Sequence, residues 1–212
     1  MAITNGYATL ADVKAAARIT DSVDDALLET SVETASRMID EYCERRFFTN
    51  GTETRTYAPD DPYVLTIDDV AGASLTLKTS SALNGTFDQT WVAGTDYQAE
   101  PTTRIVSGIA WPATQLRAIG SYVFTAPGAY PVNFFGIPDS AQVTAVFGFG
   151  TAVPTQIKHA TILLALRQFK RYDSPTGVIG FGDFGPVRVG SRLDPDVAMI
   201  LNPFRRTQVG AA

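Results

Sequence analysis

The sequence predicts an α+β protein in which a discontinuous helical bundle, made of the two N-terminal helices and the C-terminal helices, carries an inserted antiparallel β domain. Both ends of the 212-residue chain show helical periodicity, and about a hundred residues between them hold short β-branched and aromatic runs punctuated by turn formers. Helices bury their apolar stripes most simply against one another. The expected parts are therefore residues 1–50 (helical), 51–150 (β) and 151–212 (helical).

Two helices are expected near the N-terminus. Residues 9–12 (Thr-Leu-Ala-Asp) and 22–25 (Ser-Val-Asp-Asp) both have the spacing of a capping box, with a hydroxyl that accepts from a backbone amide and a carboxylate three residues later. The helices should span about residues 10–18 and 23–46. The second carries an apolar stripe at alternating spacings of four and three, formed by Leu28, Val32, Ala35, Ile39 and Tyr42.

Short runs rich in β-branched and aromatic residues indicate the strands of the β domain. They occupy residues 63–67, 74–78, 91–94, 104–108, 121–126 and 141–150. Residues 125–138 contain several turn formers and aromatic residues, which favours a long connection over a regular element.

Helical periodicity returns at residues 154–172. Pro154 suits a first turn, and Arg167, Lys170 and Arg171 crowd the last turns, where positive charge complements the helix dipole. The buried side is expected to hold Ile157, Ala160, Leu163 and Leu164.

A last short helix is expected directly after Asp194. Asp194 can cap it, Pro195 fits its first position, and Asp196 lies in its first turn. The helix should end before Asn202 and Pro203, because a proline disfavours helical geometry in the residue before it.

Residues 180–185, Gly-Phe-Gly-Asp-Phe-Gly, match the phosphate-binding pattern of dinucleotide sites and contain the kinase triplet Asp-Phe-Gly. Neither site is expected, because a dinucleotide loop needs a buried strand before it and a helix after it. This string instead follows a helix and a linker and continues into an extended stretch. The glycines and Phe181 and Phe184 are more simply read as a structural turn.

Composition argues against most kinds of catalytic or metal site. A single cysteine, Cys43, and a single histidine, His159, cannot form a disulfide framework or a zinc site of the usual kind. Cys43 is interpreted as a packed thiol and not as a nucleophile served by His159. No apolar run approaches the roughly 20 residues that span a bilayer, and the first residues lack a secretory signal. We therefore expect a cytoplasmic location or an assembly built there, with no enzymatic activity, metal or cofactor.

Two features of the β domain stay open to a second interpretation. Residues 60–61 and 68–69, each Asp-Asp, are either acidic turns or the start of a calcium site. Trp91, Tyr97 and Trp111 either fill a core or form a platform for sugar stacking.

The charge is distributed unevenly along the chain. Residues 1–151 hold 9 of the 17 Lys and Arg residues but 18 of the 22 Asp and Glu residues, so an acidic body precedes a basic end. Such asymmetry indicates that the two parts face different partners, although solvated helix faces give the same pattern.

Three stretches of the chain resemble the head-to-tail adaptor (connector) proteins of long-tailed bacteriophages, particularly those of actinobacterial hosts. They are residues 9–47, 143–175 and 177–206. The resemblance rests on three features of these stretches. They are a strand that ends in an aromatic-glycine turn and Val-Pro, a helix with a basic end, and a closing Asp-Pro-Asp helix followed by Phe-Arg-Arg.

The resemblance implies a structural virion protein at the neck, assembled in the host cytoplasm. Such adaptors form a ring, usually of twelve subunits, that docks below the portal and supports stopper or tail-terminator proteins around channel DNA, which it does not bind sequence-specifically. The segment that enters the portal would contain Asp194, Asp196, Met199, Leu201, Phe204, Arg205 and Arg206, with Phe204 as its apolar anchor.

The residues themselves suit this role. A short capped helix with a Phe-Arg-Arg tail has little to bury alone, so docking is expected to order it. Acidic residues along a channel would repel the phosphates of DNA. Contacts between neighbouring subunits could pair basic residues of the third helix with glutamates of the second; the candidates are Arg167, Lys170, Arg171, Glu29 and Glu33.

Two other functions remain open. A tail or baseplate protein could use the β domain to bind sugar or calcium. A small DNA-binding module could use the basic C-terminal end, and its affinity for duplex DNA would then fall steeply with salt.

Overall fold

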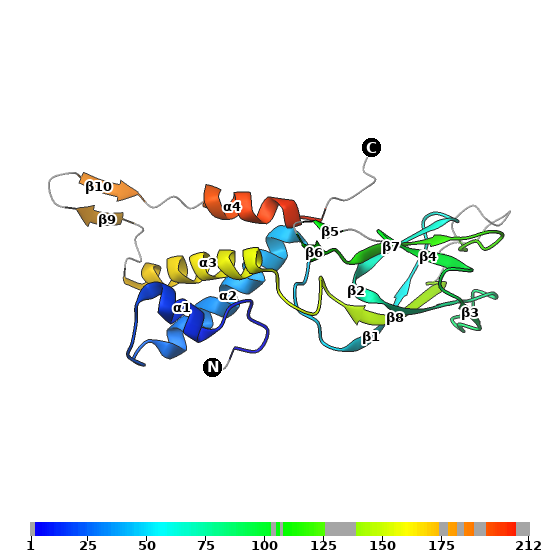
Figure 1. Ribbon diagram of the computed structural model, residues 1–212, viewed down its shortest axis with the longest axis horizontal. Coiled ribbons are helices and arrows are strands. Elements are labelled where there is room, and N and C mark those ends of the chain that lie inside the picture. Colours follow the sequence, from blue (N-terminus) through cyan, green and yellow to red (C-terminus); the bar gives the residue numbers. More distant parts are fainter. Residues whose placement is uncertain are drawn as a thin grey trace. The chain divides into compact units, whose positions relative to one another are not determined.

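A computed structural model describes residues 3–102, 105–106, 108–125, 139–173, 178–181, 185–188 and 194–206. The chain divides into two compact units, one made of residues 1–45 and 153–212 and the other of residues 46–152. The first is helical and the second holds the main β-sheet (Figure 1). The predicted α+β class and the discontinuous helical part are confirmed.

The described residues of the helical unit form four α-helices. They are α1 (Leu10–Ala17), α2 (Asp25–Cys43), α3 (Thr155–Asp173) and α4 (Pro195–Leu201), and a 3₁₀ turn, η2 (Asn202–Phe204), follows α4 directly. Figure 1 shows α2 and α3 side by side, and α1 and α4 also pack against them. Segments more than a hundred residues apart in sequence thus share one hydrophobic core.

The capping box that the sequence predicts at α1 is present. The Asp12 amide donates to Thr9 Oγ1 over 3.2 Å, and the Thr9 amide donates to Asp12 Oδ2 over 2.9 Å. The same carboxylate pairs with Lys158 Nζ at 2.9 Å, which joins the start of α1 to α3. These bonds satisfy amides that the first turn of a helix leaves unpaired.

The capping box predicted at residues 22–25 is wrong. The helix α2 begins at Asp25, and its N-cap is Asp24, whose side chain makes no capping bond. The turn is held differently, since Asp21 Oδ1 accepts from the Val23 amide over 3.1 Å. Lys14 Nζ in addition binds Asp25 Oδ1 at 2.6 Å. The Asp21 side chain thus fixes the turn that leads into α2 but does not cap the helix.

The buried faces of α2 and α3 largely follow the predicted stripes. The α2 core positions Leu28, Val32, Ala35 and Ile39 are fully buried, as are Ile157 and Ala160 on α3. Two positions differ from the prediction. Cys43 closes the α2 stripe in place of the half-buried Tyr42, and Leu163 is exposed while Ala165 is buried. Because the α-helix has 3.6 residues per turn, an apolar stripe drifts around a long helix. The sequence therefore predicts burial least well for residues at the edges and ends of the stripe.

The described residues of the β unit form an antiparallel six-stranded sheet. Its strands are β1 (Thr52–Tyr57), β2 (Val64–Thr79), β3 (Gln89–Trp91), β4 (Tyr97–Glu100), β7 (Ala113–Ala118) and β8 (Ala141–Phe147). The order is β1-β8-β2-β7-β4, and β3 pairs with β2. A short hairpin of β5 (Ile105–Val106) and β6 (Ile109–Ala110) stands apart from this sheet.

Several predicted strands need correction. The runs at 63–67 and 74–78 are one long strand, β2, which changes partner from β7 to β8 through a register shift near Gly72 (φ +83°). Residues 121–125 form a turn and irregular backbone, and the rest of the predicted loop lies outside the described residues. Strands β1, β4 and β7 were not predicted, because their threonines, glutamines and charged residues obscure the strand pattern.

Residues 180, 181 and 185 of the glycine-rich string lie in two paired strands. Strand β9 (Val178–Phe181) pairs antiparallel with β10 (Gly185–Arg188), and Gly185 stands opposite Phe181. Phe184 lies outside the described residues. Gly185 begins a strand and not the helix that a nucleotide loop requires.

Candidate functional site

The helix α4 and the turn η2 form the segment that the sequence singles out for docking. As predicted, Asp194 caps α4 and its Oδ1 accepts from the Asp196 amide over 3.1 Å, while Pro195 occupies the first turn. The Ala198 amide closes the first turn by donating to the Asp194 carbonyl over 2.8 Å. The chain thus starts a helix here from local chemistry alone.

One side of this segment is buried within its own helical unit. Val197 is 2% exposed, Leu201 is fully buried and Phe204 is 5% exposed. These residues follow a spacing of four and three, so they form one apolar stripe facing the other helices. Phe204 is therefore packed within its own helical unit and is not exposed as an apolar anchor.

Polar contacts also hold the segment to the end of α2. The Arg206 amide donates to the Cys43 carbonyl over 2.9 Å, and the Tyr42 hydroxyl donates to Asn202 Oδ1 over 2.7 Å. The Cys43 thiol approaches the Leu201 carbonyl at 3.9 Å. Burial raises the pKa of Cys43 to about 12, so the thiol stays protonated at neutral pH and is a poor nucleophile.

The opposite side of the segment is open to solvent. Asp196, Met199 and Arg205 are exposed there, and Met199 is 70% exposed. The Arg205 guanidinium lies 5.2 Å from the Tyr42 ring centroid, a cation–π contact that favours one position for this exposed cation. We call Asp196, Met199 and Arg205 the docking face. It combines an apolar side chain with both signs of charge.

Of the predicted inter-subunit residues, Glu33 is already engaged within the helical unit. Its Oε1 accepts from the amides of Thr4 and Asn5 over 2.5 and 3.1 Å. The N-terminal segment is also bound through Tyr7, whose amide donates to Ser36 Oγ over 3.0 Å and whose hydroxyl bonds Asp40. The sequence did not predict this, because nothing local to residues 3–7 marks α2 as their partner.

The basic end of α3 remains accessible. Lys170 and Arg171 are exposed, Tyr172 is 58% exposed, and Arg167 is half-buried. Glu29 on α2 is half-buried. Lys170 and Arg171 are consequently the members of the predicted inter-subunit set that are most available to an acidic neighbour.

The paired aspartates of the β unit serve the fold. Asp61 Oδ1 accepts from the amides of Tyr63 and Val64 over 2.7 and 3.0 Å, and Asp68 Oδ2 pairs with Arg55 Nη1 at 2.8 Å. Within the described ranges, no group of three or more His, Cys, Asp or Glu side chains could hold a metal ion.

The aromatic residues that could have formed a sugar platform lie largely inside. Trp91 is 5% exposed and stacks on Phe124 with ring centroids 4.8 Å apart, and Tyr97 is 2% exposed. Trp111 is half-buried and meets Phe149 edge-on. Two of the three rings therefore belong to the β core.

No helix in the described part of the chain is long and apolar enough to cross a membrane. No curated protein matches the chain. Residues 7–81 match the family described as "Phage gp6-like head-tail connector protein". This match covers α1, α2 and the first strands of the β unit.

Solved structures match the whole chain. It is similar to a chain of "Neck of empty GTA particle computed with C6 symmetry", with a TM-score of 0.56 and 14% identity, and to one of "Neck of native GTA particle computed with C12 symmetry", with a TM-score of 0.56 and 13% identity. A third match, "Virion of native gene transfer agent (GTA) particle", has a TM-score of 0.54 and 16% identity. Each match covers 100% of this chain and 96% of the other. The sequence resemblance to phage head-tail connector proteins is thus confirmed, with residues 7–81 matching the gp6-like connector family and the complete chain sharing the fold of these neck chains.

Proposed function

We propose that this protein is a structural subunit of the neck of a phage-like particle, where copies form a ring below the portal and join the DNA-filled head to stopper or tail proteins. The observation that carries the proposal is the connector-family match over residues 7–81, together with a fold shared along the whole chain with neck chains. The sixfold and twelvefold symmetry of those necks supports a ring, usually of twelve subunits.

The docking face is the part of the helical unit that turns toward the portal. It presents Met199 as the apolar contact, with Arg205 beside it as a planar cation that can pair bidentately with a carboxylate. Phe204 and Leu201 support this face from behind, because they fix the turn on which Arg205 stands. Arg206, half-buried and tied through its backbone to Cys43, is in a position to add a second cation.

Contacts between ring neighbours use the exposed basic end of α3. Lys170 and Arg171 face solvent, and the chain offers many carboxylates for them to meet. Glu33 is not one of these partners, since the N-terminal segment occupies it. In this proposal, the excess of carboxylates in residues 1–151 also repels the phosphates of DNA in the channel, so that the duplex does not bind to the ring.

The docking face is tested by a double substitution that leaves the buried stripe intact. The variant Met199→Asp with Arg205→Glu should fold normally, yet its binding to DNA-filled heads that carry the portal should fall at least about tenfold, because an apolar and a charge-paired contact are both lost. Deleting the whole segment is a poorer test, since it would also strip Leu201 and Phe204 from the core.

Val23→Asp is the matched control, because Val23 is 86% exposed in the turn before α2 and lies far from α4 in sequence. Its binding to heads should equal that of the unmodified protein. Normal attachment of the double variant would contradict the assignment of the docking face. Salt-sensitive binding to free duplex DNA would instead favour the DNA-binding module.

A further inference from the structure

The described β-sheets end in outer strands whose outward backbone groups pair with no other described strand. There are three such sheets: the six-stranded sheet, the β5–β6 pair and the β9–β10 pair (Figure 1). The outward N–H and C=O groups of an outer strand can bind a strand of another chain. Proteins usually prevent this by making the outer strand very short, by placing a proline in it or by covering it with a loop. An outer strand without such protection is therefore expected to have a partner in the assembly.

Several of the outer strands are short or blocked. The strands β3, β5 and β6 have only three, two and two residues. In β4, the Tyr97 carbonyl already accepts from the Gly94 amide over 2.8 Å. Pro101, which has no N–H to donate, follows β4 directly. These strands offer little to a further strand.

The strand β10 is blocked by a proline, whereas β9 is not. Pro186 stands opposite Gly180. Because proline has no N–H, these two residues cannot exchange hydrogen bonds, so the residue pairs on either side of them hold β9 and β10 together. The outer edge of β10 therefore lacks the N–H of Pro186, while the N–H and C=O groups of Gly180 and Val178 point outward from β9. A pair of strands alone is only marginally stable in water, so a third strand on β9 would stabilise it.

The strand β1 is the longest of the described outer strands, with six residues. Its orientation follows from β8, to which it is paired. The residues directly before and after β8 bond to the β2 side: the Ser80 amide donates to the Ser140 carbonyl over 2.9 Å, and the Gly148 amide donates to the Asp69 carbonyl over 2.8 Å. Because alternate residues of a strand bond to opposite neighbours, the odd-numbered residues of β8 bond to β1.

The register between β1 and β8 then shows which backbone groups are open. Glu53, Arg55 and Tyr57 stand opposite odd-numbered residues of β8, so they make the bonds between the two strands. The N–H and C=O groups of the three intervening threonines point outward, and the side chains of these threonines are exposed. They are Thr52, Thr54 and Thr56.

The charged residues of β1 leave this edge accessible. Charged side chains on an outer strand often keep other strands away. Here the Glu53 carboxylate pairs with Arg55 Nη2 at 2.5 Å and with Arg46 Nη2 at 2.8 Å, and Arg55 Nη1 pairs with Asp68 at 2.8 Å. Their charges are thus balanced within one network, and the outward positions of β1 are uncharged threonines.

We propose that, in the ring, β9 of one copy pairs with the outer edge of β1 of the next copy, in the antiparallel sense of every described sheet ladder of this chain. The inference rests on the proposed function, because a closed head-to-tail ring requires every subunit to present two different and complementary surfaces. The two strands meet this requirement, since each lacks the neighbour that the other provides and they belong to different units of the chain. Main-chain hydrogen bonds supply the affinity of such strand addition.

Disulfide capture tests the pairing in the full-length protein. In an antiparallel contact, outward-facing residues of one strand stand opposite outward-facing residues of the other, so Val178 faces one of the three threonines. Val178→Cys is therefore combined in turn with Thr52→Cys, Thr54→Cys and Thr56→Cys. Directly opposite Cβ atoms lie about 4.5–5.5 Å apart. Under mild oxidation, one of the three double variants should give a ladder of linked chains that ends at the ring size and is reversed by reductant.

Single variants and a mismatched pair are the controls. Each single variant should give at most dimers, because the contact places the two cysteines on different copies. Thr54→Cys with Val23→Cys should give no ladder, since Val23 lies in the turn before α2 and is 86% exposed. The native Cys43 does not interfere, because it is fully buried and burial raises its pKa to about 12. A disulfide formed only within single chains would overturn the pairing between copies.

Thr54→Pro is an independent test. Proline removes the outward N–H of residue 54, leaves the bonds from β1 to β8 in place and is tolerated in outer strands. Ring formation should weaken about tenfold, because one main-chain bond is lost and its acceptor stays unpaired. The matched control Thr54→Val keeps the N–H and should assemble like the unmodified protein. Unchanged assembly of Thr54→Pro, with folding checked by thermal unfolding, would overturn the pairing; if this variant does not fold, the disulfide series decides.

Mass measurement separates this inference from the proposed function. If the protein forms rings, alone or in isolated necks, and none of the three double variants gives a ladder beyond the controls, the strand pairing is overturned while the ring stands. If no ring is found in solution or in isolated necks, both proposals fail.

Discussion

At the scale of single residues, the chain relies on a few side chains that join segments distant in sequence. Asp12 is the clearest case, because one carboxylate caps α1 and pairs with Lys158 on α3. The hydrogen bond from the Thr9 side chain and then that from Lys158 lower the pKa of Asp12 from 3.8 to about 2.

The pH dependence of stability should therefore reflect Asp12. Since its pKa is lower in the folded than in the unfolded chain, the ionised carboxylate stabilises the fold above about pH 4, and this contribution disappears as the pH falls through about 2. Asp12→Asn should lower the free energy of unfolding by about 1 kcal/mol at pH 7. Denaturant titrations between pH 2 and 7 should show the difference from the unmodified protein shrinking toward pH 2.

Lys158→Ala is the companion variant for Asp12. It should remove only part of the effect, because the hydrogen bonds from Thr9 remain and contribute most to the lowered pKa. A difference between Asp12→Asn and the unmodified protein that stays constant down to pH 2 would contradict this account.

Gly148 is the second residue on which the fold depends. It follows β8 with φ +134°, and an added Cβ would collide with the Phe48 carbonyl oxygen. Its amide donates to the Asp69 carbonyl over 2.8 Å, so the backbone cannot shift without losing that bond. The aromatic-glycine turn seen in the sequence thus has a steric cause.

Gly148→Ala should lower the free energy of unfolding by about 3 kcal/mol or more, because unfavourable backbone geometry and a backbone clash combine. Gly85→Ala is the matched control, since Gly85 also has positive φ (+81°) but open space around its Cβ position. It should lower stability by only about 1 kcal/mol. If thermal or chemical unfolding showed the same loss of free energy for Gly148→Ala and Gly85→Ala, the clash with the Phe48 carbonyl would not contribute to stability.

At the scale of elements, α4 shows which structural information the sequence contains locally. Its start was predictable because Asp194, Pro195 and Asp196 make a complete N-terminal signal within three residues. The four-and-three spacing of Val197, Leu201 and Phe204 also indicates which side of the segment is buried. The interpretation of Phe204 as a free anchor was wrong because a helix this short was assumed to have nothing of its own to pack against.

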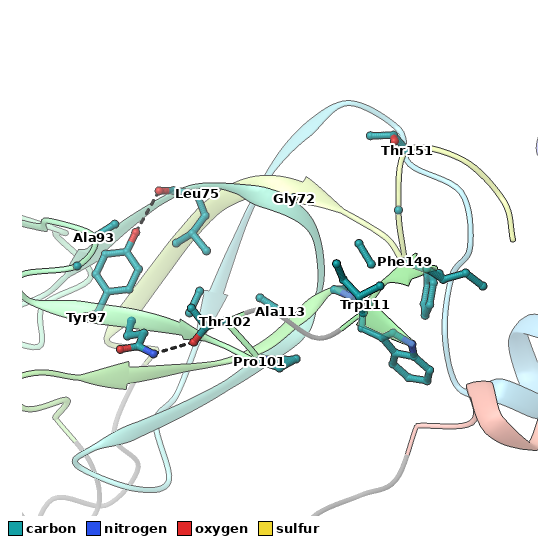
Figure 2. A pocket seen from close by; sticks show the side chains of 18 of the residues that line it. Gly72, Leu75, Ala93, Tyr97, Pro101, Thr102, Trp111, Ala113, Phe149 and Thr151 are labelled. Carbon is teal, nitrogen blue, oxygen red and sulfur yellow. Dashed lines mark hydrogen bonds between the residues drawn. The ribbon is translucent and has the colours of Figure 1, made fainter. Parts of the chain in front are cut away.

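Other elements depend on distant partners and could not be predicted in the same way. The two runs of β2 were separated by Asp68, Asp69 and Gly72, and only pairing with β7 and β8 makes them one strand. Strand β1 reads as polar sequence, yet it gains order by pairing with β8 along its length. A cavity in the β unit (Figure 2) is lined by residues scattered between Gly72 and Ala152, so no short stretch of sequence contains it.

The packing of α4 can be tested by comparing its two sides. Phe204→Ala should lower the free energy of unfolding by about 3 kcal/mol, since it leaves a space in the helical core. Met199→Ala should change it by less than about 0.5 kcal/mol, because Met199 is mostly in solvent. Equal small losses for both variants, measured by calorimetry, would mean that the segment does not pack on its own unit.

At the scale of the whole molecule, the chain divides into two compact units. We propose that the helical unit docks on the portal through Asp196, Met199 and Arg205 and meets ring neighbours through Lys170 and Arg171. Each unit has its own buried core, so substitutions on the exposed surface of one should leave the fold of the other intact.

The most direct test of the central claim is cryo-electron microscopy of particles that contain this protein. The account predicts a ring of identical subunits with this fold at the neck, surrounding the DNA channel and touching the portal. Finding the protein at the tail tip or baseplate, or finding no copy of it in the particle, would contradict that claim.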